Sequence, residues 1–324
     1  MEKQKSLKLN LQHFAEFDPD HVLLQDAKTG EIPKEQGTLV LKEIISNSVM
    51  MQLAQHEEMT KQEKEFQYLA EGVGAYWVGE GEVIRTSRPQ WLTAKMVAKK
   101  LGVIVPVSRE FLQYTLSDFF AQVRPLIAEA FYKKFDEATI LGVDNPFPQS
   151  LQESITDADH IVAGDITNDS FFDLSDLVNE AGFDINAYVS KKQNRSALRR
   201  IVDGYEQADG TITDPVRLYN RSGNTLDGSP VVDLESAEMD KGELFGGNFN
   251  YVRYGIPYNL NYSISEEAQL SSIVDENGEP INLFERELIA IRATMDVGFM
   301  VLKDDAFAKI EPEENGGEDG GETP

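Results

Sequence analysis

The chain of 324 residues contains no cysteine, which excludes disulfide bonds, thiolate catalysis and cysteine-based metal sites. Basic residues are scarce: 30 lysines and arginines stand against 56 aspartates and glutamates, so the net charge is −26. A chain of that charge is repelled by nucleic acid and by anionic lipid. No hydrophobic run approaches the roughly 20 residues that a membrane-spanning helix needs. The remaining composition, 41% hydrophobic and 27% charged, is typical of a globular protein whose stability comes from packing and association.

Catalytic and ligand-binding motifs are also missing. Only four histidines occur, and the zinc-protease-like start His56-Glu57-Glu58 lacks the second histidine that this motif requires. The segment 157–160, Asp-Ala-Asp-His, could bind a hard cation, but a solvated loop is the favoured interpretation. Arg195, Arg199 and Arg200 could contact phosphate, yet bases in such a run more often form a solvated face or inter-subunit ion pairs. We therefore expect no enzymatic activity, no cofactor and no metal.

Three patterns predict the main elements of the first half. After an irregular arm over 15–40, residues 39–53 show the apolar spacing of a short amphipathic helix. Residues 64–107 are rich in β-branched and aromatic residues around a glycine-rich middle, which predicts two long antiparallel strands joined by a tip. Residues 108–141 carry the strongest helix pattern, which ends before Gly142. Pro125 removes a backbone donor inside that helix and predicts a kink one turn earlier.

The second half alternates between helix and strand patterns. Segments 171–182 and 192–202 predict helices, the latter basic, and the apolar segment 187–190 predicts a buried strand. Residues 203–228 form a polar excursion that is too long for a simple hairpin turn. Strand patterns return at 228–232, 244–249 and 288–297. The final segment 311–324 holds six acids, four glycines and no base, a composition that predicts disorder.

Residues 7–15, Leu-Lys-Leu-Asn-Leu-Gln-His-Phe-Ala, alternate apolar and polar side chains, which favours an extended conformation. A short extended terminus can be bound by a protease cleft as an added strand, so the segment is either a frayed start of the fold or a removable leader. It resembles the processing signal of certain phage coat proteins and of a large-subunit ribosomal protein of Gram-positive bacteria, which a dedicated cysteine protease removes. The resemblance implies cleavage between Phe14 and Ala15, although His13 replaces the first aromatic residue of the commoner Phe-Phe-Ala ending.

Four further patches, in this order along the chain, resemble the major capsid protein of tailed bacteriophages, whose coat fold herpesviruses also use. They are residues 75–80 (AYWVGE), 101–112 (LGVIVPVSREFL), 198–203 paired with 228–232, and 283–307. Together they cover about residues 40–310. The resemblance is strongest to the coat proteins of staphylococcal-type siphophages, which also carry a cleaved leader.

The resemblance implies an α+β fold with an N-arm, an extended β-hairpin loop, a peripheral domain with a long kinked spine helix, and an axial domain. Its boundaries are a cleaved leader at 1–14, the N-arm with a short helix at 15–62, the extended β-loop at 63–94, the peripheral domain with the spine helix at 95–150, the axial domain at 151–258, the return strands of the peripheral domain at 259–310 and the acidic tail at 311–324.

The resemblance also implies a function. Copies are expected to self-assemble as hexamers and pentamers into an icosahedral shell that encloses double-stranded DNA without sequence-specific binding, in a virion assembled in the bacterial cytoplasm. Expected partners are sister copies, a scaffolding protein, a portal protein and a host- or phage-supplied cysteine protease, with no membrane contact. Inter-subunit contacts are expected from aromatic and arginine side chains of the hairpin, because such residues supply most interface energy: Tyr76, Trp77, Arg85, Arg88 and Trp91.

Two alternatives remain open from the residues alone. A shell protein of an encapsulin-type cellular nanocompartment shares this architecture, although the phage-style leader argues against it. A cytosolic carboxylate hydrolase is possible because carboxylate pairs are plentiful among 56 acids, but pairs at that abundance arise by chance.

Overall fold

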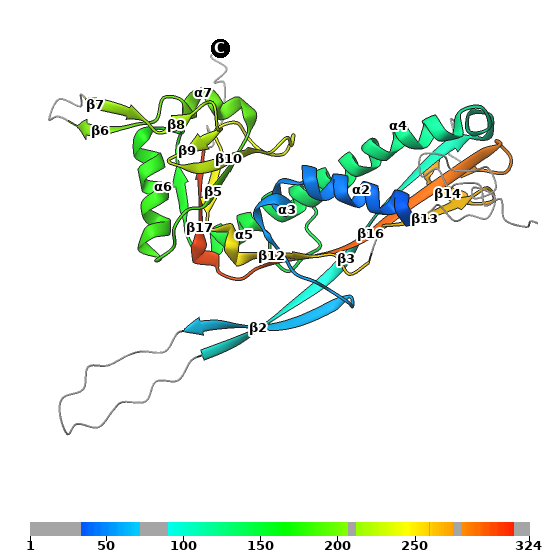
Figure 1. Cartoon of the computed structure of the whole chain (residues 1–324), viewed down its shortest axis with the longest axis horizontal. Helices are drawn as coiled ribbons and strands as arrows, with labels where there is room; N and C mark the ends of the chain where they lie inside the picture. The colour runs from blue at the N-terminus through cyan, green and yellow to red at the C-terminus, as the bar shows by residue number, and fades with distance from the viewer. Residues whose placement is uncertain (1–33, 72–89, 207–211, 259, 275–279, 314–324) are drawn as a thin grey trace, which may run out of the picture.

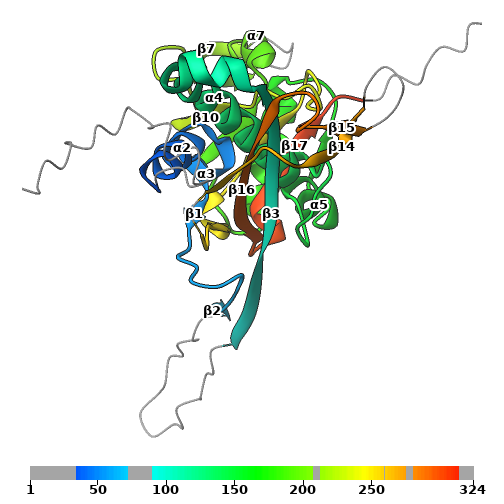
Figure 2. The same ribbon diagram turned by 90° about the vertical axis from the view of Figure 1, so that its right-hand side faces the viewer.

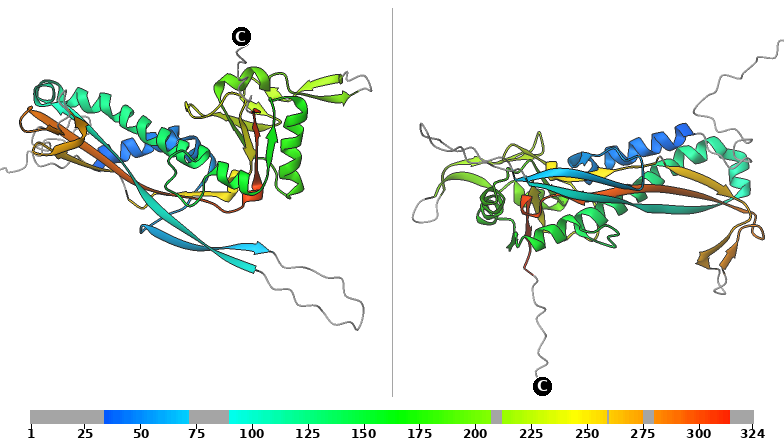
Figure 3. Two further views of the ribbon diagram at one scale, coloured as in Figure 1. Left: turned by 180° about the vertical axis from the view of Figure 1, so that it is seen from behind. Right: turned by 90° about the horizontal axis from the view of Figure 1, so that it is seen from below.

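The computed structural model describes residues 34–71, 90–206, 212–258, 260–274 and 280–313. They form an elongated body, a lobe at one end of the body and a hairpin that projects from the body on the side opposite to the long helix (Figures 1 and 3). The leader, the hairpin tip and residues 314–324 lie outside the described residues. Among the described residues, no helix combines the length and the apolarity of a membrane-spanning segment.

The body begins with two consecutive helices, α2 (Lys34–Asn47) and α3 (Val49–Leu53). Val40 and Ile44 are buried one turn apart in α2, which packs against the long helix of the body. The predicted helix at 39–53 is therefore present but begins earlier. The expectation of an irregular arm over 15–40 is wrong from Lys34 onward, where α2 already begins, five residues before its first apolar residue Leu39.

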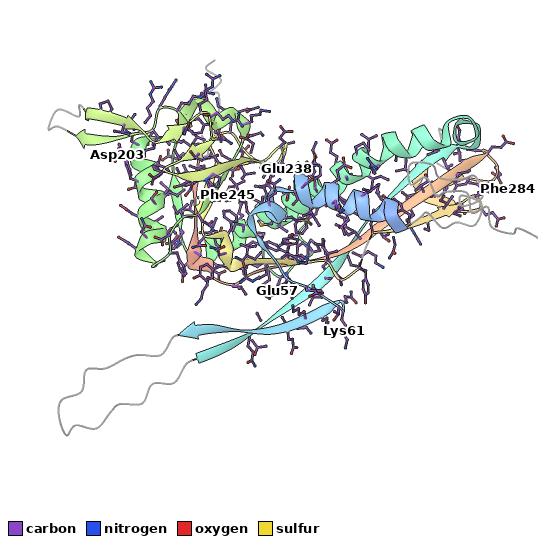
Figure 4. All side chains as sticks on the ribbon, in the orientation of Figure 1. Glu57, Lys61, Asp203, Glu238, Phe245 and Phe284 are labelled. Atoms are coloured by element: carbon purple, nitrogen blue, oxygen red, sulfur yellow. The ribbon has the colours of Figure 1, made fainter. Side chains whose placement is uncertain are left out.

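A six-stranded sheet forms the floor of the body. Its main order is β1 (Gln55–His56), β12 (Val252–Gly255), β16 (Leu288–Val301), β3 (Gln90–Ser108) and β2 (Glu63–Glu71), and β13 (Asn261–Ser265) pairs with β16. The predicted pair of long antiparallel strands is confirmed, because β2 and β3 run antiparallel from Glu63 opposite Val97 to Glu71 opposite Gln90. The far end of the body carries the hairpin of β14 (Gln269–Val274) and β15 (Pro280–Asn282), close to Phe284 (Figure 4).

The long helix α4 (Arg109–Asp136) lies over this sheet and continues into a π-helical turn at Glu137–Leu141. Gly142 ends it with a φ of 73°, a left-handed conformation that glycine adopts without strain, so the predicted stop is confirmed. Figure 1 shows the first turns of α4 end-on and the rest in profile, so the helix bends. Pro125 lies within the continuous helix and is exposed, and its part in the bend stays a prediction.

The lobe is built on a seven-stranded sheet. The strand order is β4 (Ile161–Ala163), β17 (Phe307–Glu311), β11 (Leu244–Gly247), β5 (Ala187–Ser190), β10 (Ser229–Asp233), β9 (Thr225–Leu226) and β8 (Tyr219–Asn220). The helix α6 (Asn168–Glu180) buries Phe171, Leu174 and Val178 against this sheet, and α5 (Leu151–Asp157) joins the lobe to the body. The buried strand expected at 187–190 is confirmed as β5, all four residues of which are buried.

The basic helix expected at 192–202 is present only up to Leu198, and the prediction is wrong beyond that residue. The structure has a 3-10 turn at Lys192–Asn194, a single helical turn α7 (Arg195–Leu198) and then β6 (Val202–Glu206). Leu198 and Ile201 are buried in the core of the lobe, which ends the helix and directs Val202 into a strand that pairs with β7 (Ile212–Arg217). The polar excursion 203–228 is therefore two hairpins, β6–β7 and β8–β9.

The C-terminal tail also begins later than expected. Glu311 is the last residue of β17, where it pairs with Ala163 of β4. The expected disorder over 311–324 is therefore wrong at its first residue, because the sheet hydrogen bonds of the lobe hold Glu311.

Candidate functional site

The projecting hairpin is the most prominent feature that no part of the described chain covers. One strand, β3, supplies both its attachment and its outer arm. Residues 90–97 of β3 pair with β2, whereas residues 98–108 pair with β16 inside the body. Figure 2 shows β3 running as one continuous strand from the body into the hairpin. β3 is continuous, but its pairing partner changes from β2 to β16 between Val97 and Ala98, so the hairpin is joined to the body sheet through β3 itself.

The base of the hairpin is tightly packed. Met59, Met96 and Ala98 are buried together, and two glycines make room for them. A Cβ on Gly255 would lie 2.6 Å from Met59 Sδ, and one on Gly298 would lie 3.0 Å from Met96 Cγ. A side chain at either position would have to displace a methionine, so both glycines make room for the methionine packing at the base of the hairpin.

Ion pairs flank the same base. Lys95 of β3 lies 2.8 Å from Glu63 of β2, and Lys64 lies 3.1 Å from Glu57 and donates a hydrogen bond to the carbonyl of Glu58 at 2.6 Å. Glu57 and Lys61 lie at this junction in Figure 4. Exposed pairs of this kind contribute little to stability individually, so the hairpin is held mainly by the shared strand β3 and by the methionine packing at its base.

A buried carboxylate joins the N-terminal helices to the long helix. Asp136, the last residue of α4, accepts hydrogen bonds from Ser48 Oγ at 2.6 Å, from Val49 N at 2.8 Å and from Met50 N at 3.1 Å. These donors stand at the first turn of α3, where backbone N–H groups lack helical partners. Burial raises the pKa of Asp136 to about 6, against the opposing effect of these three hydrogen bonds.

This raised pKa predicts a stability that falls with rising pH. Between about pH 4 and pH 6 the folded chain keeps a proton on Asp136 that the unfolded chain releases, so the free energy of unfolding decreases as pH rises through this window. The decrease should reach up to about 3 kcal/mol. Urea unfolding at several pH values should show that Asp136→Asn removes this part of the slope. Asp144→Asn is the control, since the ion pair with Lys134 lowers the pKa of that exposed carboxyl; an unchanged slope in Asp136→Asn contradicts the assignment.

The residues predicted to make inter-subunit contacts fall mostly outside the described residues. Tyr76, Trp77, Arg85 and Arg88 belong to the segment 72–89 that joins β2 to β3, and Phe14 and Ala15 belong to the N-terminal segment 1–33. Trp91 is placed by its backbone alone, opposite Leu69 in the β2–β3 ladder. The structure thus puts the two arms of the hairpin together, and the contacts of its tip stay predictions.

Three of the candidate ligand residues have local partners instead. The ring of His56 packs against Tyr254 with centroids 5.2 Å apart, and His160 Nδ1 lies 3.0 Å from the carbonyl oxygen of Phe307. Arg195 forms an ion pair with Asp233 of the same chain. Within the part of the chain that the structure describes, no group of three or more His, Asp or Glu side chains is placed to bind a metal ion.

Sequence reasoning missed Asp136, Gly255 and Gly298. In the sequence, Asp136 does not differ from other acidic residues near the ends of helices, and its hydrogen-bond partner Ser48 is 88 residues away. The only available signal was that Ser48 interrupts the apolar helix pattern at 39–53, as a helix N-cap would.

Comparison with known proteins identifies the architecture. The model of the phage capsid family matches residues 30–311. The major capsid protein of Staphylococcus phage 80alpha is 47% identical over 320 residues, which are 96% of each chain, and a probable major capsid protein of Mycobacterium phage L5 is 22% identical over 87% of this chain and 89% of its own length.

Solved structures agree with this. A chain from Microbacterium phage Oxtober96 has a TM-score of 0.65 at 24% identity, covering 82% of this chain and 91% of its own length. The capsid of an empty GTA particle has a TM-score of 0.60 at 18% identity, covering 81% and 89%. These matches confirm the resemblance predicted from the sequence and favour neither the nanocompartment shell nor the carboxylate hydrolase. The hairpin, the long helix and the lobe are therefore the parts of a coat subunit, and this chain belongs to the phage capsid family.

Proposed function

We propose that this tailed-phage coat subunit assembles as hexamers and pentamers into an icosahedral shell that encloses double-stranded DNA. The observation that carries the proposal is the hairpin, which extends the body sheet beyond any other described element (Figure 1). A long two-stranded ribbon with exposed edges is a liability in a lone molecule, and it is used when a sister copy covers it. Phe284, 72% exposed at the opposite end of the body, is a second apolar group without cover.

Electrostatics favour containment of DNA over binding. A net charge of −26 per copy repels the polymer at long range, so the shell encloses DNA without sequence-specific contacts. The same net charge makes copies of the chain repel one another. Extensive interfaces of roughly 2,000 Å² or more are needed to offset this repulsion. The role is structural, with no enzymatic activity in the coat subunit itself.

The parts of the subunit divide as follows in this proposal: an N-arm over 15–62, an extended loop over 63–94, a peripheral domain over 95–150 and 259–310, and an axial domain over 151–258. Support comes from the separate core of the lobe, which joins residues of α6, β5 and β10. That core also takes in Ala308 and Ile310 of β17, so the last residues of the range 259–310 pack with the axial domain and not with the peripheral domain.

Assembly is proposed to need further proteins: a scaffolding protein, a portal protein and a cysteine protease that removes the leader. Co-expression of the full chain with candidate scaffold and protease, followed by negative-stain microscopy, tests the shell. Closed particles of uniform size are expected. A chain that stays monomeric under every combination of helpers contradicts the proposal.

Leader removal makes a separate prediction. Residues 1–14 hold three lysines and one glutamate, so their loss lowers the net charge from −26 to −28. Intact mass spectrometry of mature particles should give a subunit that begins at Ala15. Phe14→Glu should abolish cleavage, because an acidic side chain does not fit a pocket selected for an aromatic ring, whereas Phe17→Glu should leave cleavage unchanged. Mature particles built from full-length chains would show that the leader is retained.

A further inference from the structure

The strand β3 changes partners where the hairpin meets the body, and this leaves part of one edge unpaired. The ladder with β2 ends at Val97, and the next hydrogen bond on that side runs from Ala98 N to the carbonyl oxygen of Gln62 at 2.8 Å. From residue 99 to residue 107, β16 is the only described strand that pairs with β3, and it lies on the other side. A stretch of β3 within the body therefore has backbone groups that no described strand binds.

The alternation of the ladder identifies these groups. In an antiparallel pair, one residue directs both its N–H and its C=O to one side, and the next residue directs them to the other side. Ala98 donates away from β16, so Lys100, Gly102 and Ile104, at the same spacing, face the open side too. All three are exposed. Pro106 continues this series, and a proline without an N–H is expected on a strand edge that has no partner.

An apolar recess adjoins the start of this open edge. Leu101, Phe135, Phe147 and Val297 supply its apolar lining. The rings of Phe135 and Phe147 are buried and pack edge to face with centroids 6.1 Å apart, so this part of the lining is fixed. The volume of about 220 Å³ is smaller than the roughly 300–1,000 Å³ of small-molecule sites. The recess therefore fits a single apolar side chain of a peptide better than a free ligand.

The rim of the recess is positively charged. Lys99, Lys100 and Lys134 line it together with one acid, Asp144, which lies 2.6 Å from Lys134. Lys99 and Lys100 have no ion-pair partner among the residues that the structure describes, although Asp296 stands opposite Lys100 in the ladder. On a chain with a net charge of −26, this local excess of positive charge is complementary to an acidic partner.

We propose that the open edge of β3 and the recess beside it bind an extended acidic segment of a second, different protein. The segment adds to β3 as a strand, places one apolar side chain in the recess and brings carboxylates to Lys99 and Lys100. Backbone hydrogen bonds supply affinity in this mode of recognition, and the alternate side chains supply specificity. The inference concerns the folded subunit and does not depend on shell assembly.

Sister copies match this site less well. Two copies of the edge would bring one Lys100 close to the other, and lysine on a strand edge disfavours such pairing. The hairpin of a sister copy carries acids, but Glu63 already pairs with Lys95 of its own chain. A separate acidic segment has free carboxylates to offer.

Peptide binding to the purified full chain tests the site. The probe is a fluorescein-labelled peptide of eight residues in which aspartate and leucine alternate, and fluorescence anisotropy gives its Kd. A lysine–leucine peptide of the same length should bind at least tenfold more weakly. The aspartate–leucine peptide methylated on every backbone nitrogen keeps its side chains but cannot add as a strand, so it should also lose at least tenfold. Equal binding of the methylated and unmethylated peptides would mean attraction by charge alone and would overturn the proposal.

Variants and amide hydrogen exchange locate the bound peptide. Lys99→Glu with Lys100→Glu should weaken binding at least tenfold, whereas Lys42→Glu, which changes an exposed lysine of α2, should change it less than twofold. The unaltered chain should show at least fivefold slower exchange at Lys100, Gly102 and Ile104 when the peptide is bound. Unchanged exchange at these three amides would place the peptide elsewhere and contradict the proposal.

One backbone variant separates the two possible occupants. Ile104→Pro removes a donor of the open edge without removing a hydrogen bond to β16, as Pro106 already does two residues later. It should weaken peptide binding at least fivefold while the thermal unfolding midpoint stays within a few degrees. Sedimentation of the unaltered chain alone should show no association through this edge. A dimer that Ile104→Pro abolishes would assign the edge to a sister copy and refute the proposal.

Discussion

Gly247→Ala should destabilise the lobe, with a loss of about 3 kcal/mol in the free energy of unfolding. Gly247 is the last residue of β11, opposite Phe307 of β17 and Ala187 of β5. A Cβ at this position would lie 2.5 Å from the carbonyl oxygen of Ala306 and 2.9 Å from Phe307 Cα. Both atoms belong to backbone, at the start of β17 and in the turn just before it, so they cannot rotate away as a side chain could and the backbone around Gly247 must shift.

Urea denaturation, monitored by circular dichroism, measures the change in the free energy of unfolding. The matched control is Gly223→Ala in the exposed turn between β8 and β9, where the nearest atom to a Cβ would be Thr225 Cγ2 at 3.6 Å. That change should stay within about 0.5 kcal/mol of the parent chain. A Gly247→Ala chain that is as stable as the Gly223→Ala chain would mean that the β11–β17 contact adjusts freely.

Replacing the hairpin tip, residues 72–89, by an Asn-Gly turn should abolish shell assembly while the subunit stays folded. Glu71 and Gln90 are opposite one another in the β2–β3 ladder, so a two-residue turn of this type can join them. The fold should survive because Met59, Met96 and Ala98 still anchor the base. Assembly should fail because the replacement removes Tyr76, Trp77, Arg85 and Arg88, the residue types that dominate protein interfaces.

Particle yield under the co-expression conditions above is the readout, and a drop of at least 100-fold is expected. Thermal unfolding of the soluble chain must match the parent within a few degrees, which separates loss of contacts from loss of fold. Trp77→Ala should give an intermediate yield, whereas Lys61→Ala, an exposed residue at the hairpin base, should assemble normally. Normal shells from the tip-replaced chain would exclude the hairpin from the interface.

Much of the fold was predictable because local patterns agree with tertiary packing. β-branched residues at 101–107 and 288–297 predicted strands, and these pair with each other in the sheet. The prediction of a helix over all of 192–202 failed because the local pattern and the tertiary packing disagree there. The charges of that segment favour a solvated helix locally, but burial of Leu198 and Ile201 in the lobe ends it after one turn.

The close contacts could not be predicted from one sequence. Asp136 and Ser48 are 88 residues apart, and Gly247 meets Phe307 from a different strand. The residues next to them in the sequence give no indication of these long-range contacts. The hairpin was recognisable by its glycines and aromatic residues, and its proposed contact with a sister copy rests on its length and on the resemblance to coat proteins.

The shared strand β3 has a mechanical consequence. A pull on the hairpin acts along the axis of β3. Eleven residue pairs, arranged in a row along that axis, join β3 to β16. All of these hydrogen bonds are then loaded in shear together and cannot be unzipped one after another. If a neighbouring copy holds the hairpin as proposed, tension on the hairpin would pass through β3 into the sheet of its own body.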